Sequence, residues 1–212
     1  MPTRDRRKRV SASPLIDPEV CCLVLLAPDQ QAYATLREPV RRRLVRNVLA
    51  LTTAARMMEV PVFVSWPADG GEAFASQLAP GAEYRHFHAG PHPAPWLDSE
   101  FMAALGQQDR RALIIGGFWL EHQVLATSLH ALAAAYDVYV LADVTPPQSN
   151  AAAQPSHNRL LVQGARPVVT SQVIHEWSLA ASAEERVSLE VLLDNVVERR
   201  RAAIDSGLAA TP

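Results

Sequence analysis

The stretch Ala-Leu-Ile-Ile-Gly-Gly-Phe-Trp-Leu-Glu-His-Gln-Val-Leu, residues 112–125, decides the fold of this chain. Its apolar run predicts a buried strand, its two glycines predict a break, and the residues that follow predict the start of a helix. Many α/β hydrolytic enzymes hold a nucleophile at such a turn, because the first N–H groups of the helix are free and its dipole end is positive. This turn presents Glu121, His122 and Gln123, and none of them is Ser, Cys or Thr.

Composition bounds the class of protein. With 212 residues, 49% of them hydrophobic and 20% charged, the chain has the length and balance of a globular domain. A net charge of −2 gives no electrostatic argument for a nucleic acid or membrane partner, and no apolar run approaches the ~18 residues of a membrane span. Residues 3–9 hold five positive charges, which fit either a contact with a nucleic acid or an acidic partner or a solvated tail, and without aromatic residues we favour the tail. No apolar core follows them, so they are not read as a secretory signal. We therefore expect a basic arm at 1–17, one domain at 18–205 and a flexible tail at 206–212.

The two cysteines are adjacent, and the chain has one lysine. Cys21 and Cys22 lie inside an apolar run, where neighbouring side chains of a strand point to opposite faces, so no bridge between them is expected. Two buried free thiols are typical of a reduced, cytoplasmic protein. The lysine is Lys8 in the basic arm, so every other fixed positive side-chain charge comes from arginine.

Apolar periodicity and turn residues divide the chain into alternating strands and helices. Residues 20–27 are apolar throughout and end at Pro28, which is typical of a central strand buried on both faces. Asp98 is a good N-cap for a short helix that runs to Leu105. We predict further strands at 60–66, 84–88, 112–117, 137–142 and 165–170, and further helices at 37–58, 121–136, 151–163 and 183–201.

Strands that alternate with helices form parallel βαβ units, so we predict a three-layer α/β/α sandwich. Ligands bind such sheets at the carboxyl ends of the strands, near the switch in strand order. Asp29, the turn at 118–123 and the loop after Asp143 all follow predicted strands. We therefore expect the functional site where these segments meet.

Five blocks of sequence occur in a characteristic order. They are Leu-Val-Leu-Leu-Ala-Pro-Asp-Gln-Gln (23–31), Asn-Val-Leu-Ala-Leu (47–51), Pro-Val-Phe-Val-Ser (61–65), Leu-Ile-Ile-Gly-Gly-Phe-Trp-Leu-Glu (113–121) and Val-Tyr-Val-Leu-Ala-Asp (138–143). Over most of the chain they resemble the isochorismatase-like cysteine hydrolases, and among these the YcaC-type hydrolases. The resemblance implies a Rossmann-like, six-stranded parallel sheet of order 3-2-1-4-5-6, a homo-oligomer, and a cis peptide near residues 118–120.

The resemblance also implies a catalytic triad of Asp, Lys and Cys that hydrolyses small amides. The thiolate attacks the carbonyl, the Asp moves protons, and backbone N–H groups bind the oxyanion. The family's Asp falls on Asp29, its Cys falls on Gln123, and its Lys falls near His88 or Ala89. Leu120 stands where the family has a Thr. The nucleophile and the cation are therefore both missing at the aligned positions.

Several side chains have two interpretations at this stage. Gln123 and His122 are candidates to bind a ligand, but Gln123 equally fits as a filler that satisfies neighbouring polar groups. Glu121 is interpreted as structural, near the helix start. The aromatic residues Trp66, Trp96 and Trp119 are candidates for a pocket wall, and their alternative location is the core or a subunit interface. Leu120 and His88 are candidates for the same pocket wall. Residues His86, His88 and His92 are weak metal candidates, and we expect neither a metal nor a cofactor.

Three functional hypotheses follow from these residues. The first is a catalytically degenerate member of the family, a pseudoenzyme that acts by binding a small molecule or by oligomeric assembly. The second is a hydrolase of the isochorismatase type that needs no thiol and uses Asp29 as general acid on a vinyl ether or amide, with an arginine such as Arg85 in place of the lysine. The third is a histidine–metal hydrolase.

Overall fold

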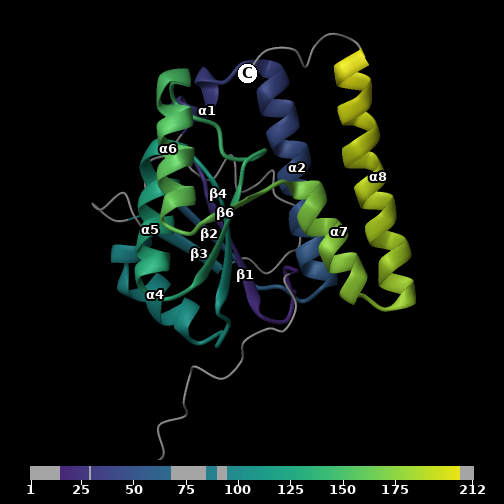
Figure 1. Cartoon of the computed structure of the whole chain (residues 1–212), viewed down its shortest axis with the longest axis horizontal. Coiled ribbons are helices and arrows are strands. Elements are labelled where there is room, and N and C mark those ends of the chain that lie inside the picture. The colour runs from purple at the N-terminus through teal and green to yellow at the C-terminus, as the bar shows by residue number, and fades with distance from the viewer. Residues whose placement is uncertain (1–14, 29, 68–84, 90–94, 206–212) are drawn as a thin grey trace, which may run out of the picture.

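The computed structural model describes residues 15–28, 30–67, 85–89 and 95–205; the side chains of residues 30, 66–67, 85–89 and 198–205 lie outside this description. The described strands form one parallel sheet in the order β3-β2-β1-β4-β5-β6, as predicted (Figure 1). They are β1 (Cys21–Leu26), β2 (Val62–Pro67), β3 (Arg85–Ala89), β4 (Ala112–Gly117), β5 (Asp137–Leu141) and β6 (Arg166–Val168).

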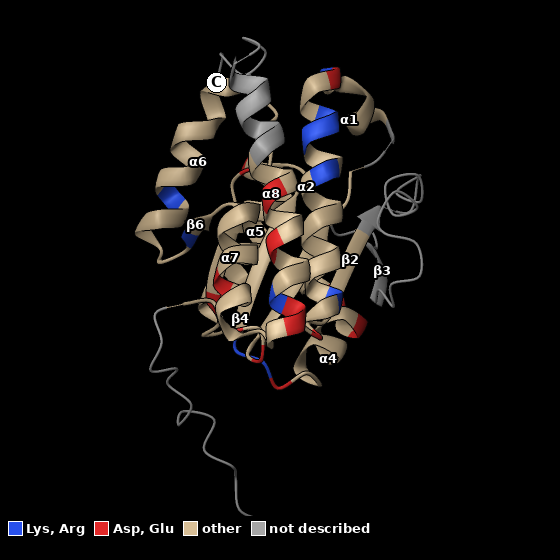
Figure 2. Ribbon diagram, turned by 90° about the vertical axis from the view of Figure 1, so that its right-hand side faces the viewer, with Lys and Arg blue, Asp and Glu red and all other residues tan. Residues whose placement is uncertain are grey.

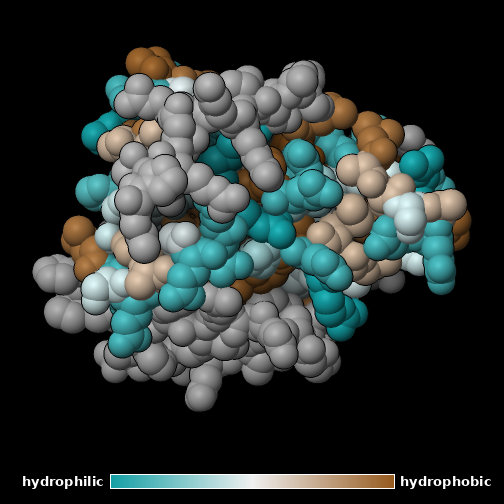
Figure 3. Space-filling model, turned by 90° about the horizontal axis from the view of Figure 1, so that it is seen from below, coloured by the Kyte–Doolittle hydropathy of each residue, from teal (hydrophilic) through white to brown (hydrophobic). Residues whose placement is uncertain are grey.

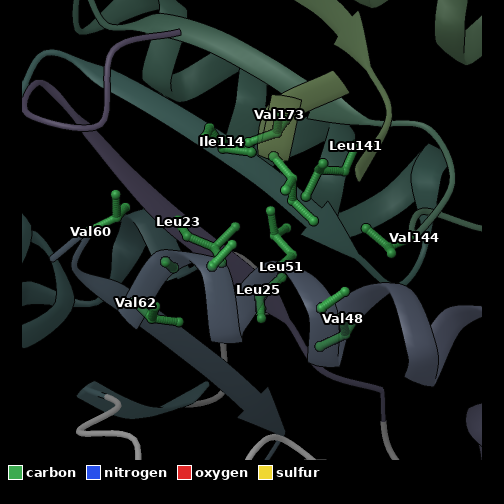
Figure 4. Packing of buried hydrophobic residues seen from close by; sticks show 14 of the residues in the cluster. Leu23, Leu25, Val48, Leu51, Val60, Val62, Ile114, Leu141, Val144 and Val173 are labelled. Carbon is green, nitrogen blue, oxygen red and sulfur yellow. The ribbon is translucent and has the colours of Figure 1, made fainter. Parts of the chain in front are cut away.

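The central strand β1 is buried on both faces, which explains its uninterrupted apolar sequence. Leu23 and Leu25 belong to one core cluster, and Val24 and Leu26 belong to the other, because successive side chains of a strand point to opposite faces. Figure 4 shows Leu23 and Leu25 packed against Leu51 on the first of these faces. The sheet therefore separates two cores, each covered by its own helices.

Helices α2 (Glu38–Met57), α7 (Thr170–Ala180) and α8 (Ala183–Asp205) pack against one another over one face of the sheet. The other face is covered by α4 (Ser99–Gly106), α5 (Leu125–Ala133) and α6 (Asn150–Val162), and the two groups lie on opposite sides in Figure 1. Shorter helical segments are α1 (Gln30–Thr35), a 3₁₀ turn at Pro95–Leu97 and a π-helical turn at Leu120–Val124. The three-layer α/β/α prediction is confirmed.

Local signals placed several helix ends correctly. The Asp98 carboxylate accepts hydrogen bonds from the N–H groups of Glu100 (2.8 Å) and Phe101 (3.0 Å), which confirms its predicted role as the N-cap of α4. Ser149 caps α6 in the same way through Ala152 N (3.2 Å). Among the described helices, none is long and apolar enough to cross a membrane.

Several predicted boundaries were wrong, and two helices were not predicted. The last helix extends to Asp205 rather than ending at Arg201, and the second strand begins at Val62 rather than at Val60. The helix expected at 121–136 begins with a π-helical turn and ends at Ala133, because Ala135 adopts a φ of 64° and Tyr136 N bonds back to Ala131 O. The strand expected at 165–170 is only Arg166–Val168, since Thr170 already begins α7. Helices α1 and α7 had no counterpart in the sequence prediction.

The amino ends of the strands lie at the bottom of Figure 1, and hydrophilic residues cover much of the described surface there (Figure 3). Arg110 donates to three backbone carbonyls at this end, those of Pro18, Cys21 (3.0 Å) and Glu59 (3.2 Å). Ile16 is buried and its N–H donates to the Glu176 carboxylate (2.7 Å), so the packed body includes this residue of the expected arm. Residues 1–14 of that arm and the expected tail at 206–212 lie outside the described residues.

Candidate functional site at the carboxyl end of the sheet

The carboxyl ends of β1 and β4 meet at Leu26 and Gly117, which are register partners. Gly117 has a φ of +129°, and a Cβ built on it would lie 2.0 Å from the Leu26 carbonyl oxygen, so the close approach of these two strands requires glycine. Phe118 N donates to the same carbonyl (2.9 Å), and Gly117 N donates to the Thr145 hydroxyl (3.3 Å). The second glycine of the opening motif therefore turns the chain at the predicted place.

The chain then passes through a cis peptide bond between Phe118 and Trp119, in the region where the resemblance implied one. A π-helical turn follows at Leu120–Val124, with Val124 N donating to Trp119 O (3.2 Å). Leu120 N donates to Pro146 O (3.1 Å), which ties this turn to the loop after β5. The first turn of the expected helix is thus wider than an α-helical turn.

Glu121 holds the same loop from its side chain. Its carboxylate accepts hydrogen bonds from Gln148 N (3.0 Å to both oxygens) and from Ser149 N (3.1 Å to Oε1). Since Ser149 is the N-cap of α6, Glu121 joins the π-helical turn to the start of that helix. The interpretation of Glu121 as a structural residue agrees with these contacts.

Gln123 is half-buried in the middle of the π-helical turn. Within the part of the chain that the structure describes, its side-chain amide has no hydrogen-bond partner. The side chains of Asp29 and of residues 85–89 lie outside the description, so both interpretations of Gln123 stay predictions. Neighbouring His122 is exposed; its backbone N–H donates to Trp119 O (3.2 Å), and its carbonyl accepts a hydrogen bond from Leu125 N. Among the described residues, no side-chain partner of the His122 imidazole is found.

The predicted aromatic wall is only partly assembled here. Trp119 is half-buried and packs edge-to-face on Phe118, with ring centroids 4.9 Å apart. Leu120 is fully buried in the core, so its side chain offers no exposed surface. Trp96 packs on Tyr136 (5.7 Å), which directly precedes β5 at the amino end of the sheet.

Tyr136 also follows the C-terminal end of α5, whereas Gln123 precedes the N-terminal end of that helix. From Gln123 to Ala133 the helical backbone rises by roughly 15 Å, so Tyr136, on which Trp96 packs, follows the end of α5 that is far from Gln123. Residue type alone did not indicate this, because strand direction decides at which end of the sheet an aromatic ring lies.

Several predicted residues cannot be placed by their side chains. Asp29 and His92 lie outside the described residues. The backbones of β2 and β3 pair so that Val64 is opposite His86 and Trp66 is opposite His88, while Ala89 pairs with Pro67. Among the side chains that the structure does describe, no group of three His, Cys, Asp or Glu residues could hold a metal ion. The metal candidates at His86, His88 and His92 therefore stay untested.

Both thiols lie at the opposite end of the sheet from this turn. Cys21 and Cys22 are fully buried, free, and paired in register with Ala112 and Leu113 at the amino end of β4. Cys22 is four residues from Leu26 along β1, a distance of about 13 Å in an extended strand. Burial, reinforced by the neighbouring Cys22, raises the pKa of the Cys21 thiol far above its usual range. Both sulfurs are therefore buried and lie at the end of β1 far from the turn at Gly117.

A polar network beside this site had not been predicted. The Asp143 carboxylate accepts hydrogen bonds from Asn47 Nδ2 (2.9 Å), from Thr170 N (3.0 and 3.1 Å) and from Thr170 Oγ1 (3.0 Å). Asn47 and Thr170 are buried, so the network replaces the water that these groups lose on folding. The available signal was Asn47 itself, a polar residue on the apolar face of a predicted helix.

The isochorismatase domain model matches residues 21–173, which is most of the chain. The chain belongs to the isochorismatase domain family. No curated protein matches it.

Solved structures agree on the fold. The YcaC gene product of Escherichia coli, described as an octameric hydrolase of unknown specificity, has a TM-score of 0.74 at 21% identity over 94% of this chain and 98% of that one. YcaC from Pseudomonas aeruginosa, solved with hexane-2,5-diol and covalent acrylamide, has a TM-score of 0.75 at 20% identity over 91% and 96%. The MAR1 ribonuclease of Caenorhabditis elegans has a TM-score of 0.72 at 15% identity over 84% and 91%. At these identities the likeness extends to the fold alone.

Proposed function

We propose that this member of the isochorismatase family performs no cysteine-hydrolase chemistry and binds a small molecule at the carboxyl end of its sheet. The observation that carries the proposal is the position of the thiols, which are fully buried at the amino end of β1. The family's nucleophile position, by resemblance, falls on Gln123, whose carboxamide does not form an acyl-enzyme at neutral pH. A thiol-dependent reaction therefore lacks its nucleophile.

The binding part of the proposal rests on side chains that the fold leaves available. The Gln123 side chain is half-buried, and its amide has no hydrogen-bond partner among the described residues, so it can both donate to and accept from a ligand. Trp119 adds a half-buried aromatic surface next to it, and His122 adds an exposed imidazole. Asp29 directly follows Pro28, the last described residue after β1, and we propose it as the acidic group of the site.

Small polar molecules are the class that we propose for this site. One carboxamide and one aromatic ring suit a ligand that offers a carbonyl or hydroxyl group beside an apolar part. The structure of the Pseudomonas aeruginosa relative contains a diol and an acrylamide, which are molecules of this size and chemistry.

Self-association belongs to the same proposal. The Escherichia coli relative is octameric, and α8 of this chain exposes Val187 (62%) and Val191 (57%) one helical turn apart, with Leu179 of α7 also exposed (53%). Exposed aliphatic side chains in a row on a helix are typical of a contact surface. A cytoplasmic location is retained as a proposal because the two cysteines are free.

The experiment measures turnover and binding on the same protein. The purified chain is assayed against isochorismate and a panel of small amides, with and without iodoacetamide, beside an Asp29→Asn variant. No turnover above the buffer rate is expected in any arm. Turnover that Asp29→Asn abolishes indicates instead the thiol-independent hydrolase, and turnover that iodoacetamide abolishes indicates a reactive thiol.

Binding is tested on the same panel, extended with diols, by ligand-detected NMR. Gln123→Ala is expected to weaken the best binder at least fivefold, since one hydrogen bond to a buried group contributes about 1 kcal/mol or more. Gln107→Ala is the matched control, because Gln107 is exposed at the end of α4. Equal affinity in the two variants contradicts a ligand site at Gln123.

A further inference from the structure

The first half of α2 concentrates positive charge. Residues 37–46 contain five arginines and one glutamate, a local net charge of +4 in a chain whose net charge is −2. We define the arginine face as Arg37, Arg41, Arg42, Arg43 and Arg46. Arg37, Arg42 and Arg43 are exposed, and the blue bands of α2 in Figure 2 gather toward the end of the molecule where this helix begins. The net charge of the whole chain, −2, does not reveal this local excess of positive charge.

This arrangement is unfavourable for the helix itself. The N-terminal end of a helix carries the positive end of its dipole, so cations there destabilise it, by about 0.3–1 kcal/mol each at the surface. Arg37 and Arg41, and likewise Arg42 and Arg46, are four positions apart, where like charges repel. Apart from the pairs that Arg41 and Arg42 make with Glu38, helix stability gives no reason for the arginine face. A local rule broken without a structural gain favours a binding role for the remaining arginines.

A single carboxylate offsets part of the charge. Glu38 bonds to Arg41 Nη2 (2.6 Å) and to Arg42 Nε (2.7 Å), and these two guanidinium groups lower the pKa of its carboxyl below the usual range. Within the part of the chain that the structure describes, Arg37 and Arg43 have no ion-pair partner. At least two exposed guanidinium groups are thus left to bind an anion from outside.

An aromatic ring borders the arginine face. The Arg41 guanidinium lies 5.9 Å from the centre of the Tyr33 ring, which is half-buried on α1. The face therefore combines guanidinium groups on α2 with one ring on the neighbouring helix.

We propose that the arginine face binds the phosphate backbone of a single-stranded nucleic acid. A planar guanidinium pairs with two phosphate oxygens at once and stacks on rings, which suits phosphates next to bases better than it suits isolated carboxylates. The face extends over ten residues of helix, roughly 15 Å, which is long enough for several consecutive phosphates. The adjoining Tyr33 ring is placed to stack on a base. This role is independent of the ligand site proposed at Gln123.

The test uses the full chain and a fluorescein-labelled 12-nucleotide oligouridylate, followed by fluorescence anisotropy at several salt concentrations. Arg37→Gln/Arg43→Gln removes the two unpaired cations, and Arg56→Gln/Arg159→Gln removes two exposed cations elsewhere on the surface. Each lost phosphate contact on a single strand reduces the slope of log K against log salt by about 0.7, so the first variant loses about 1.4. That change corresponds to roughly 25-fold weaker binding at 0.1 M salt, whereas the control binds like the wild type.

The basic arm at residues 1–17 is present in all three proteins, and Arg56 of the control lies in the last turn of α2, so a difference between the variants reports on the arginine face alone. Glutamine is a good helix former, and circular dichroism checks that α2 persists in both variants. Equal affinity of the two variants, or no binding by the wild type, overturns the proposal. Displacement of the oligouridylate by poly-aspartate at equal charge concentration also overturns it, because the partner is then an acidic protein segment.

Discussion

The side-chain amide of Asn47 donates a 2.9 Å hydrogen bond to Asp143, joining α2 to the end of β5 across 96 positions of sequence. The same carboxylate accepts hydrogen bonds from the N–H and hydroxyl of Thr170 and so caps α7. The Asp143 side chain therefore ties α2 and α7, two of the three helices on one face of the sheet, to the end of β5. Its position at the carboxyl end makes it part of the support for the candidate site.

Replacing this carboxylate is expected to be costly. Asp143→Ala leaves the buried Asn47 amide and the buried Thr170 hydroxyl without their acceptor, which costs about 2–4 kcal/mol of unfolding free energy. Urea denaturation measures the loss. The matched control is Asp194→Ala on the exposed part of α8, which is expected to change stability by less than about 0.5 kcal/mol. Similar values for the two variants contradict the role assigned to Asp143.

Two glycines should respond in opposite directions to the same substitution. Gly117→Ala places a Cβ against the Leu26 carbonyl at a positive φ, so we expect a loss of at least about 3 kcal/mol or failure to fold. Gly106→Ala meets no atom within 4 Å at the end of α4, and we expect a gain of about 0.5–1 kcal/mol. Thermal and urea unfolding measure both. A mild effect at Gly117 shows that the junction of β1 and β4 relaxes.

The buried thiol predicts a specific dependence on pH. Burial raises the pKa of Cys21 in the folded state, so folding keeps this thiol neutral while the unfolded chain ionises near its ordinary pKa of about 8.5. The resulting stabilisation is complete below that pH and is lost as the pH rises above it. Between pH 7 and about pH 9.5, the difference in unfolding free energy between wild type and Cys21→Ala should shrink by about 1 kcal/mol.

Urea denaturation at several pH values measures this difference. Val24→Ala is the control, because Val24 is equally buried in β1 and does not titrate, so its cost should not vary with pH. A constant difference for Cys21→Ala indicates that the thiol ionises in the folded protein and is accessible to chemistry after all.

Gln123 should matter little for stability. Its amide has no described hydrogen bond and its side chain is only half-buried, so Gln123→Ala is expected to change the unfolding free energy by less than about 0.5 kcal/mol. Glu121→Ala is a useful contrast, because it removes the acceptor of two backbone N–H groups and should cost about 1–2 kcal/mol. If Gln123→Ala costs as much as Glu121→Ala, then Gln123 is a structural filler rather than a ligand contact.

Much of the site's framework was readable from local sequence, but its long-range contacts were not. The Gly-Gly break, the strand before it and the Asp98 cap depend on conformations and hydrogen bonds of neighbouring residues. The sequence indicated only that Asp143 precedes a loop after a strand. It did not indicate the hydrogen bonds of Asp143, because its partners Asn47 and Thr170 are far away in the sequence. Helix α7 was missed for the same reason, since its start is set by a cap from another loop.

The sequence determined the layered α/β architecture and the burial of both cysteines, because hydrophobic patterning marks each strand and helix. It also determined the order of the six strands, through the resemblance of five ordered blocks to a known family. The tertiary structure alone decided that Trp96 packs on Tyr136, that Gln123 lacks a described partner, and that Glu121 and Asp143 hold the loops near Gln123. Those features depend on which segments meet in space. Strand direction and packing determine such meetings, and no short stretch of sequence encodes them by itself.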